Sequence, residues 1–140
     1  MLQISDQIKL SVHEQGQGPA VVFCHGFPEL AYSWRYQLPA VAAAGFRAIA
    51  PDQRGYADSS APQDINAYGI GELTGDLTGL LDNLKIDQAV FVGHDWGGLV
   101  AWAMPVLHPE RVAGVIGVCT PYMPMPVVDA LRPARDPRKQ

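Results

Sequence analysis

Short, mainly apolar runs alternate with helix-like segments along most of this chain. The runs are strand-like because they are brief and rich in β-branched residues, and they occupy 20–24, 46–51, 88–93 and 112–119. Apolar residues at helical spacing occupy 33–45, 70–86 and 97–108. Because strands that are apolar on both faces need cover on both faces, this order predicts an α/β fold with a mostly parallel sheet between helices.

Local details refine these elements. Residues 8–15, "IKLSVHEQ", alternate apolar and polar side chains, which is typical of a half-exposed strand. In the segment 33–45, Ser33 is a candidate N-cap and Gly45 fits just beyond the helix. Pro39 is an irregularity within this helix, where it is expected to kink or shift the backbone.

Composition and charge exclude several classes of protein. The chain has 140 residues, of which 48% are hydrophobic and 17% charged, so one ordinary globular domain is expected. A net charge of −4 argues against a nucleic-acid partner, since such proteins normally present a basic face. The start "MLQISDQIKL" lacks the basic and apolar regions of a leader, and no run approaches the roughly 18 apolar residues of a membrane span. A cytoplasmic protein without nucleic-acid or membrane partners is therefore expected.

The two cysteines suggest neither a disulfide nor a metal site. Cys24 and Cys119 each end an apolar run, where a free cysteine usually behaves as a small buried hydrophobe. Neither has Cys or His neighbours at the spacing of zinc ligands. The sequence also contains no P-loop and no G-x-G-x-x-G motif, so no cofactor and no metal are predicted.

The stretch "VFVGHDWGGLVAW" (90–102) places Asp95 between closely spaced glycines, where an apolar strand passes into an apolar helix. A parallel strand that ends in G-x-nucleophile-x-G before a helix forms a nucleophile elbow, a sharp turn that lifts one side chain above the sheet. The N–H groups and dipole of the following helix favour an ionised carboxylate. The pattern predicts that Asp95 is a nucleophile; the alternative is that Asp95 only caps the helix.

The segment "HGFPE" (25–29) directly follows the strand-like run 20–24. A loop at this position can present a backbone N–H toward the elbow, and the residue after the nucleophile supplies a second donor. We therefore predict an oxyanion hole made by the N–H groups of Phe27 and Trp96, whose side chains also line the substrate pocket; the alternative is an ordinary turn. Residues predicted to support this site are His25, Gly26, Pro28, Gly93, His94, Gly97 and Gly98.

Five motifs in this order resemble the α/β-hydrolase-fold epoxide hydrolases: "HGFPE", "SWRYQ", "DQRGYADSSAP", "GHDWGG" and "HPERV". The resemblance extends from about Ile8 to Tyr122 and implies the α/β-hydrolase fold. It also implies that Asp95 attacks an epoxide carbon to form an alkyl ester, which a water activated by a histidine then hydrolyses to a diol. The implied partners are a small epoxide and water, and the resemblance allows a homodimer of the full-length protein.

Parts of the implied machinery are missing from these 140 residues. In this fold an acid and then a histidine follow the nucleophile, but the sequence has four histidines and only His108 follows Asp95, at the far end of the next helix. The family also has a cap domain whose tyrosines bind the epoxide oxygen, and none of the five tyrosines here is assigned that role. We expect residues 1–122 to be the N-terminal part of the core domain, residues 123–140 a Pro/Arg-rich linker toward a missing cap, and the chain alone to be inactive.

Two other functions remain open. Haloalkane and haloacid dehalogenases of the same fold also use an aspartate nucleophile, but they often have a polar halide donor at the place of Phe27, so the apolar residue favours the epoxide. The third reading is a non-catalytic interaction module that pairs through the exposed edge of its last strand. Among the remaining residues, Asp52 and Arg54 are expected to form a structural ion pair behind the site, and Trp34 and Trp102 to be core residues.

Overall fold

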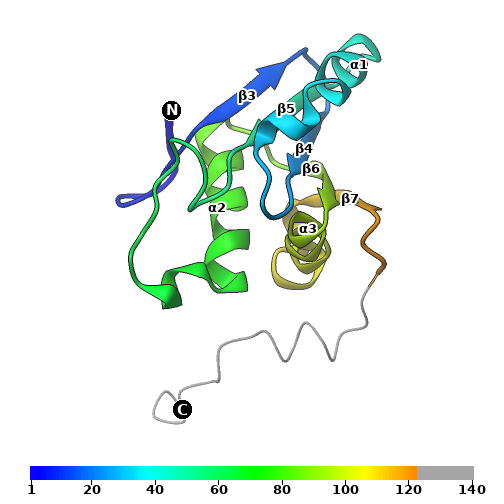
Figure 1. The fold of residues 1–140 in the computed structure, drawn as a ribbon. Coiled ribbons are helices and arrows are strands. Elements are labelled where there is room, and N and C mark those ends of the chain that lie inside the picture. The colour runs from blue at the N-terminus through cyan, green and yellow to red at the C-terminus, as the bar shows by residue number, and fades with distance from the viewer. Residues whose placement is uncertain (123–140) are drawn as a thin grey trace.

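The computed structural model describes residues 1–122, in which strands and helices alternate along the chain (Figure 1). The strands of this part are β1 (Leu2–Gln3), β2 (Lys9–Leu10), β3 (Val12–Gln15), β4 (Ala20–Cys24), β5 (Arg47–Pro51), β6 (Ala89–His94) and β7 (Val112–Val118). The α-helices are α1 (Gln37–Ala43), α2 (Ile70–Asn83) and α3 (Trp96–Leu107). Short 3-10 helices cover Ala31–Trp34, Ile65–Tyr68 and Pro109–Arg111.

The main sheet has five strands in the order β3-β5-β4-β6-β7. Strand β3 is antiparallel to β5, and the other neighbours are parallel to one another. Strands β1 and β2 form a separate antiparallel pair. The predicted fold class, a mostly parallel sheet of the α/β-hydrolase type, is confirmed.

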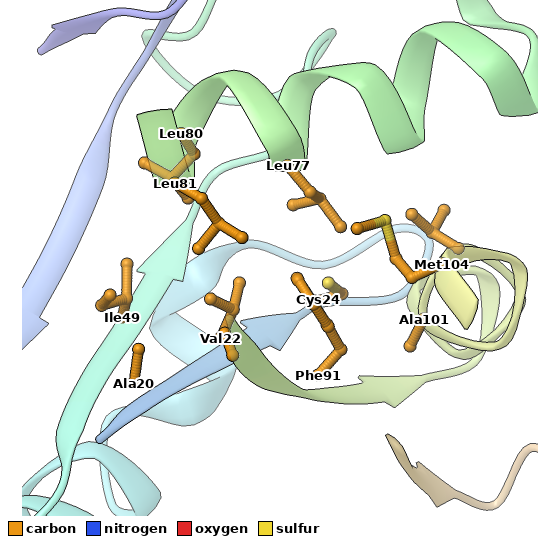
Figure 2. Packing of buried hydrophobic residues seen from close by; sticks show 12 residues of the cluster. Ala20, Val22, Cys24, Ile49, Leu77, Leu80, Leu81, Phe91, Ala101 and Met104 are labelled. Carbon is orange, nitrogen blue, oxygen red and sulfur yellow. The ribbon is translucent and has the colours of Figure 1, made fainter. Parts of the chain in front are cut away.

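Helices cover both faces of this sheet because each central strand buries side chains in both directions. On one face, Val22, Cys24 and Phe91 pack against leucines of α2 and against the middle of α3, where Ala101 and Met104 lie (Figure 2). On the other face, Phe23 packs against Trp34, and the cluster extends to Leu38 of α1. Every residue of β4 is buried, as expected from its uninterrupted apolar sequence.

The register between β4 and β6 positions the site. Their paired residues extend from Ala20 opposite Ala89 to Cys24 opposite Gly93. Because the strands are parallel, the chain leaves both at the same edge of the sheet. The loop after β4 and the turn after β6 therefore meet.

The helix predicted for 33–45 begins later than expected. Residues Ala31–Trp34 form a 3-10 helix, and α1 starts at Gln37 with Tyr36 rather than Ser33 at its N-cap. Pro39 consequently lies in the first turn of α1, where a backbone N–H would have no partner within the helix, so Pro39 does not kink it. Gly45 follows the helix with a φ of 96°, as predicted for a helix end.

The strand predicted for 8–15 is divided in two. Lys9–Leu10 pairs with β1, whereas Val12–Gln15 pairs with β5 in the main sheet. The break falls at Ser11, whose N–H donates to Ser59 Oγ at 2.9 Å. A side-chain acceptor thus replaces the neighbouring strand as the partner of the Ser11 N–H. The alternation of apolar and polar residues in 8–15 does not reveal this break in the strand.

Strand β7 is an edge strand in the described part of the chain, since only β6 lies beside it. Ile116 and Val118 are accordingly exposed. Cys119, which follows β7, is also exposed, so the expectation that both cysteines are buried is wrong for Cys119. Cys24 lies in the central strand β4, and burial raises its pKa to about 12.

The predicted core tryptophans differ in burial. Trp34 is buried beside Phe23, whereas Trp102 is half-buried and donates its indole N–H to the Thr120 carbonyl at 3.0 Å.

No helix within residues 1–122 combines the length and apolarity that a membrane crossing needs. The linker predicted for 123–140 lies outside the described residues, and the domain boundary at residue 122 stays a prediction.

Candidate active site

Asp95 occupies the sharp turn between β6 and α3. Its backbone has φ 57° and ψ −127°, a conformation that non-glycine residues rarely adopt, and its side chain is exposed. The Asp95 carbonyl accepts hydrogen bonds from the N–H of Gly98 at 2.9 Å and from Thr120 Oγ1 at 3.2 Å. The turn that the glycine pattern predicted is therefore present, with the carboxylate outside the sheet.

Three glycines allow strand and helix to approach each other at this turn. A Cβ on Gly97 would overlap the backbone carbonyl of Cys24 in the neighbouring strand. Gly93 faces the backbone of Gly97, and Gly98 lies against the Thr120 side chain, with no room for a Cβ at either position. Close packing, rather than freedom of φ, explains why glycine occurs at these positions.

Two backbone N–H groups converge on one carboxylate oxygen of Asp95. The N–H of Trp96 lies 2.6 Å from Oδ2, and the N–H of Phe27 lies 3.3 Å from the same atom. These donors, Trp96 first and Phe27 second, lower the pKa of Asp95 below its usual range, so the carboxylate is ionised at neutral pH.

Helix capping alone does not describe this arrangement. Asp95 is the N-cap residue of α3, but an N-cap side chain ordinarily accepts from the second or third helical residue and has an extended backbone. Here the carboxylate accepts from Trp96, the first helical residue, and from Phe27 in a distant loop. The convergence of donors from the start of α3 and from the loop after β4 favours a binding arrangement over a simple cap.

The loop 25–29 lies directly against the turn at Asp95. A Cβ added to Gly26 would lie 2.5 Å from the Asp95 Cβ, so only glycine allows this approach. The Phe27–Pro28 peptide bond is cis, and the Glu29 N–H donates to the Gly26 carbonyl at 3.0 Å. The segment is a tight turn, and that turn also directs the Phe27 N–H toward Asp95.

His25 supports this loop from beneath. Its ring is buried, its Nδ1 lies 2.9 Å from the Gly26 carbonyl, and its Nε2 lies 3.0 Å from the Gln53 N–H. Since Nε2 accepts from a backbone donor, Nδ1 carries the proton and the ring is neutral. Burial lowers the pKa of His25, in agreement with a neutral ring. Tyr56 packs edge-on against this ring with centroids 4.6 Å apart.

The other histidines contact groups away from the carboxylate. His94 Nδ1 lies 3.6 Å from Glu29 Oε2, which ties β6 to the loop 25–29. His13 lies 3.5 Å from Asp52, and His108 Nε2 lies 3.2 Å from Thr74 Oγ1 at the end of α3. Within residues 1–122, no histidine ring forms a hydrogen bond with the Asp95 carboxylate.

Two hollows flank the Trp96 side chain. The smaller, of about 250 Å³, is bounded by Asp95, Trp96, Leu99 and the residues just after β7. The larger, of about 410 Å³, lies among the loop after β5 and the first turns of α2 and α3. Phe27 and Trp96, each 61% exposed, both line the larger hollow. Their role as walls of a substrate pocket stays a prediction.

Arg54 and Asp52 do not form the ion pair predicted for them. The Arg54 guanidinium binds Asp76 of α2, with Nε 2.7 Å from Oδ2, and donates to the Ala67 carbonyl at 2.6 Å. Asp52 instead accepts from the Ala31 N–H at 2.8 Å. Both residues are buried and structural, but each joins the loop after β5 to a different element.

The structure adds three residues that the sequence did not single out. Gln53 contacts both Nε2 and the carbonyl of His25, Tyr56 packs on the same ring, and Thr120 donates to the Asp95 carbonyl. Their only signal in the sequence is position, because each follows a parallel strand at the edge where such sheets bind ligands. Across residues 1–122, no three His, Cys, Asp or Glu side chains gather in a way that could hold a metal ion.

The sequence matches the family model for the alpha/beta hydrolase fold over residues 19–140. It is 56% identical over 116 residues to an epoxide hydrolase of Caballeronia sordidicola, covering 83% of this chain and 35% of that protein. It is 54% identical over 119 residues to epoxide hydrolase A of Mycobacterium tuberculosis, covering 84% of this chain and 37% of that protein. The chain thus spans just over a third of the length of these curated relatives.

Solved structures agree with this comparison. An epoxide hydrolase from Vigna radiata is similar with a TM-score of 0.81 and 46% identity, over 85% of this chain and 39% of that one. Epoxide hydrolase A from Mycobacterium thermoresistibile is similar with a TM-score of 0.77 and 55% identity, over 79% of this chain and 35% of that one. The chain therefore belongs to the alpha/beta hydrolase fold family and is a homologue of its epoxide hydrolases.

Proposed function

We propose that the full-length protein containing this chain hydrolyses epoxides to vicinal diols through a covalent ester on Asp95. The observation that carries the proposal is the convergence of the Phe27 and Trp96 N–H groups on one oxygen, Asp95 Oδ2. The identity with epoxide hydrolases supports the choice of substrate.

In the first step the carboxylate is the nucleophile. The lowered pKa of Asp95 keeps it ionised, and both donors hold Oδ2, so Oδ1 is the oxygen available to attack. Oδ1 forms a bond to one epoxide carbon, the bond from that carbon to the ring oxygen breaks, and the released alkoxide takes a proton from an acid. A carboxylate suits this substrate because attack on a saturated carbon gives an ordinary ester, whereas attack on an acyl group would give a reactive anhydride.

In the second step water attacks Cγ of the ester. The negative charge then develops on Oδ2, toward which the Phe27 and Trp96 N–H groups already point. Collapse of this intermediate breaks the bond between Cγ and Oδ1, releases the diol and restores the carboxylate. One oxygen of the diol therefore comes from Asp95, and water replaces it there.

The base for the second step is assigned to the remainder of the full-length protein. His25 is neutral, and both of its ring nitrogens have partners. His94 faces Glu29, and His108 lies at the far end of α3 beside Thr74. We therefore expect the 140-residue chain alone to form no diol over multiple turnovers, and sustained diol formation by this chain would contradict the assignment.

Heavy-oxygen labelling tests the mechanism. Excess full-length protein is mixed with styrene oxide in heavy-oxygen water so that each molecule turns over once, and peptides are then analysed by mass. Label should enter the Asp95 carboxylate and be absent from the first diol, while the matched Asp95→Asn variant should initially form no diol. Label in the first diol would overturn the covalent route. Halide release from a bromoalkane without epoxide opening would favour dehalogenation instead.

A further inference from the structure

Thr120 lies just beyond the end of β7 and packs against the start of α3. Its side chain is buried and leaves no room for a Cβ on Gly98, and its carbonyl accepts the indole N–H of Trp102 at 3.0 Å. The hydroxyl oxygen, Oγ1, lies 3.2 Å from the Asp95 carbonyl, while the Val118 carbonyl is farther away at 3.4 Å. The contacts with α3 therefore hold this hydroxyl against the backbone of the nucleophile.

The Asp95 carbonyl belongs to the same peptide unit as the Trp96 N–H. This peptide is trans, so the two groups point in opposite directions from one rigid plane. The N–H lies 2.6 Å from Asp95 Oδ2, and the carbonyl accepts from Thr120 on the other side. A hydrogen bond that fixes the direction of the carbonyl therefore also fixes the direction of the N–H.

Among the described residues, Thr120 is the one donor to this carbonyl that comes from outside α3. The other two donors are the N–H groups of Gly98 at 2.9 Å and Leu99 at 3.3 Å, which belong to the helix itself. The backbone of Asp95 has φ 57° and ψ −127°, a strained conformation that needs support from its surroundings. Thr120 therefore anchors the strained peptide to the end of β7. Its hydrogen bond also polarises the peptide, which makes the Trp96 N–H a stronger donor.

We propose that Thr120 is a positioning residue, whose hydroxyl holds the peptide between Asp95 and Trp96 so that its N–H stays on Oδ2 while the alkyl ester is hydrolysed. This inference rests on the proposed function and assigns Thr120 to one of its two steps. In ester hydrolysis, negative charge develops on Oδ2, so a misdirected N–H should slow this step. In ester formation, Oδ1 attacks and the carboxylate loses its charge, so a weaker hydrogen bond at Oδ2 should have little effect.

The test uses the full-length protein in excess over styrene oxide, so that each molecule turns over once. Rapid quenching and intact mass follow the rise and decay of the ester on Asp95. Thr120→Val keeps the shape of the side chain without its hydroxyl, so ester decay should slow about tenfold while ester formation stays within about threefold. Thr120→Ser restores the hydroxyl and should decay within about threefold of the wild-type rate. The matched control, Thr78→Val, removes a hydroxyl that donates to the Gly75 carbonyl in α2 and should change neither rate.

The outcomes separate this inference from the proposed function. If the wild-type protein forms no ester on Asp95, the proposed function fails. If it forms and hydrolyses the ester, but Thr120→Val hydrolyses it at the wild-type rate, the assignment of Thr120 fails while the function stands. Equal slowing of both steps would show a purely structural role and would also overturn the assignment.

A second comparison covers the case in which Thr120→Val does not fold. Thr120→Ser and Thr120→Ala both lack the methyl group and differ only in the hydroxyl. Ester decay should be about tenfold slower in Thr120→Ala than in Thr120→Ser. Equal decay rates in these two variants would show that the hydroxyl is not responsible and would overturn the assignment.

Discussion

The Phe27 N–H donates to Asp95 Oδ2 across 3.3 Å, although the two residues are 68 positions apart in the sequence. The contact exists because β4 and β6 are neighbouring parallel strands and the loops after them meet at one edge of the sheet. Gly26 makes the approach possible, since it lies directly against Asp95.

Replacing Gly26 by alanine should destabilise the chain. The new Cβ would lie 2.5 Å from the Asp95 Cβ and 3.1 Å from the His94 carbonyl, so the loop must move and carry the Phe27 N–H away. We expect the free energy of unfolding to fall by about 1–3 kcal/mol, measured by urea denaturation. Gly71→Ala is the control: its Cβ meets nothing within 4 Å and lies in α2, so it should add about 0.5–1 kcal/mol. Equal stability of both variants would contradict the close contact.

The neutral state of His25 should make stability depend on pH. Burial lowers the pKa of His25 below 6.5, so the unfolded chain takes up this proton at a higher pH than the folded chain. The folded state should therefore lose stability as pH falls below about 6.5, by at most about 1.4 kcal/mol per pH unit, until the lower folded pKa is reached. Urea midpoints measured across this range should decline less in His25→Gln. Parallel declines in the two proteins would show that His25 is not held neutral.

The buried pair of Arg54 and Asp76 should contribute far more than an exposed pair. Asp76→Asn leaves the buried Arg54 guanidinium without a counter-ion, and we expect a loss of about 3–5 kcal/mol in the free energy of unfolding. The matched control is Asp82→Asn, because Asp82 is 68% exposed in its pair with Arg111 and should cost no more than about 1 kcal/mol. Similar losses in the two variants would argue against a buried, uncompensated charge.

The two thiols should differ in reactivity. Cys119 is exposed, whereas Cys24 is buried and its pKa is raised to about 12. A disulfide reagent should modify one thiol per native chain rapidly and the second only after unfolding. Cys119→Ser should abolish the rapid phase. Rapid modification of both thiols in the native chain would indicate that β4 is not protected.

The central strands and the turn at Asp95 could be predicted because their signals are local. A wholly apolar run such as 20–24 can only be a buried element, and glycines on both sides of Asp95 permit the close approach of strand and helix that a nucleophile elbow needs. The start of α1 was mistaken because Ser33, a good capping residue in sequence, lies in a 3-10 helix instead. The capping propensity of a single residue is a weak guide to where an α-helix begins when a 3-10 helix directly precedes it.

The partners of the side-chain hydrogen bonds and ion pairs could not be predicted from local sequence patterns. Arg54 and Asp52 are near each other in sequence, yet Arg54 binds Asp76 because α2 packs over the loop after β5. The contact of Gln53 with His25 and that of Thr120 with Asp95 likewise depend on the order of strands in the sheet. Such pairings follow from tertiary placement, which no local pattern contains.

The pairing of β4 with β6 also determines when the site can form during folding. The two strands lie far apart in sequence, so closing the intervening loop is a long-range step, and long-range pairing is slow compared with helix formation. A peptide of residues 90–102 would retain the motif around Asp95 but would lack the Phe27 N–H, which is one of the two donors to Asp95 Oδ2. The two-donor arrangement should therefore form only when β4 and β6 have paired in their native register.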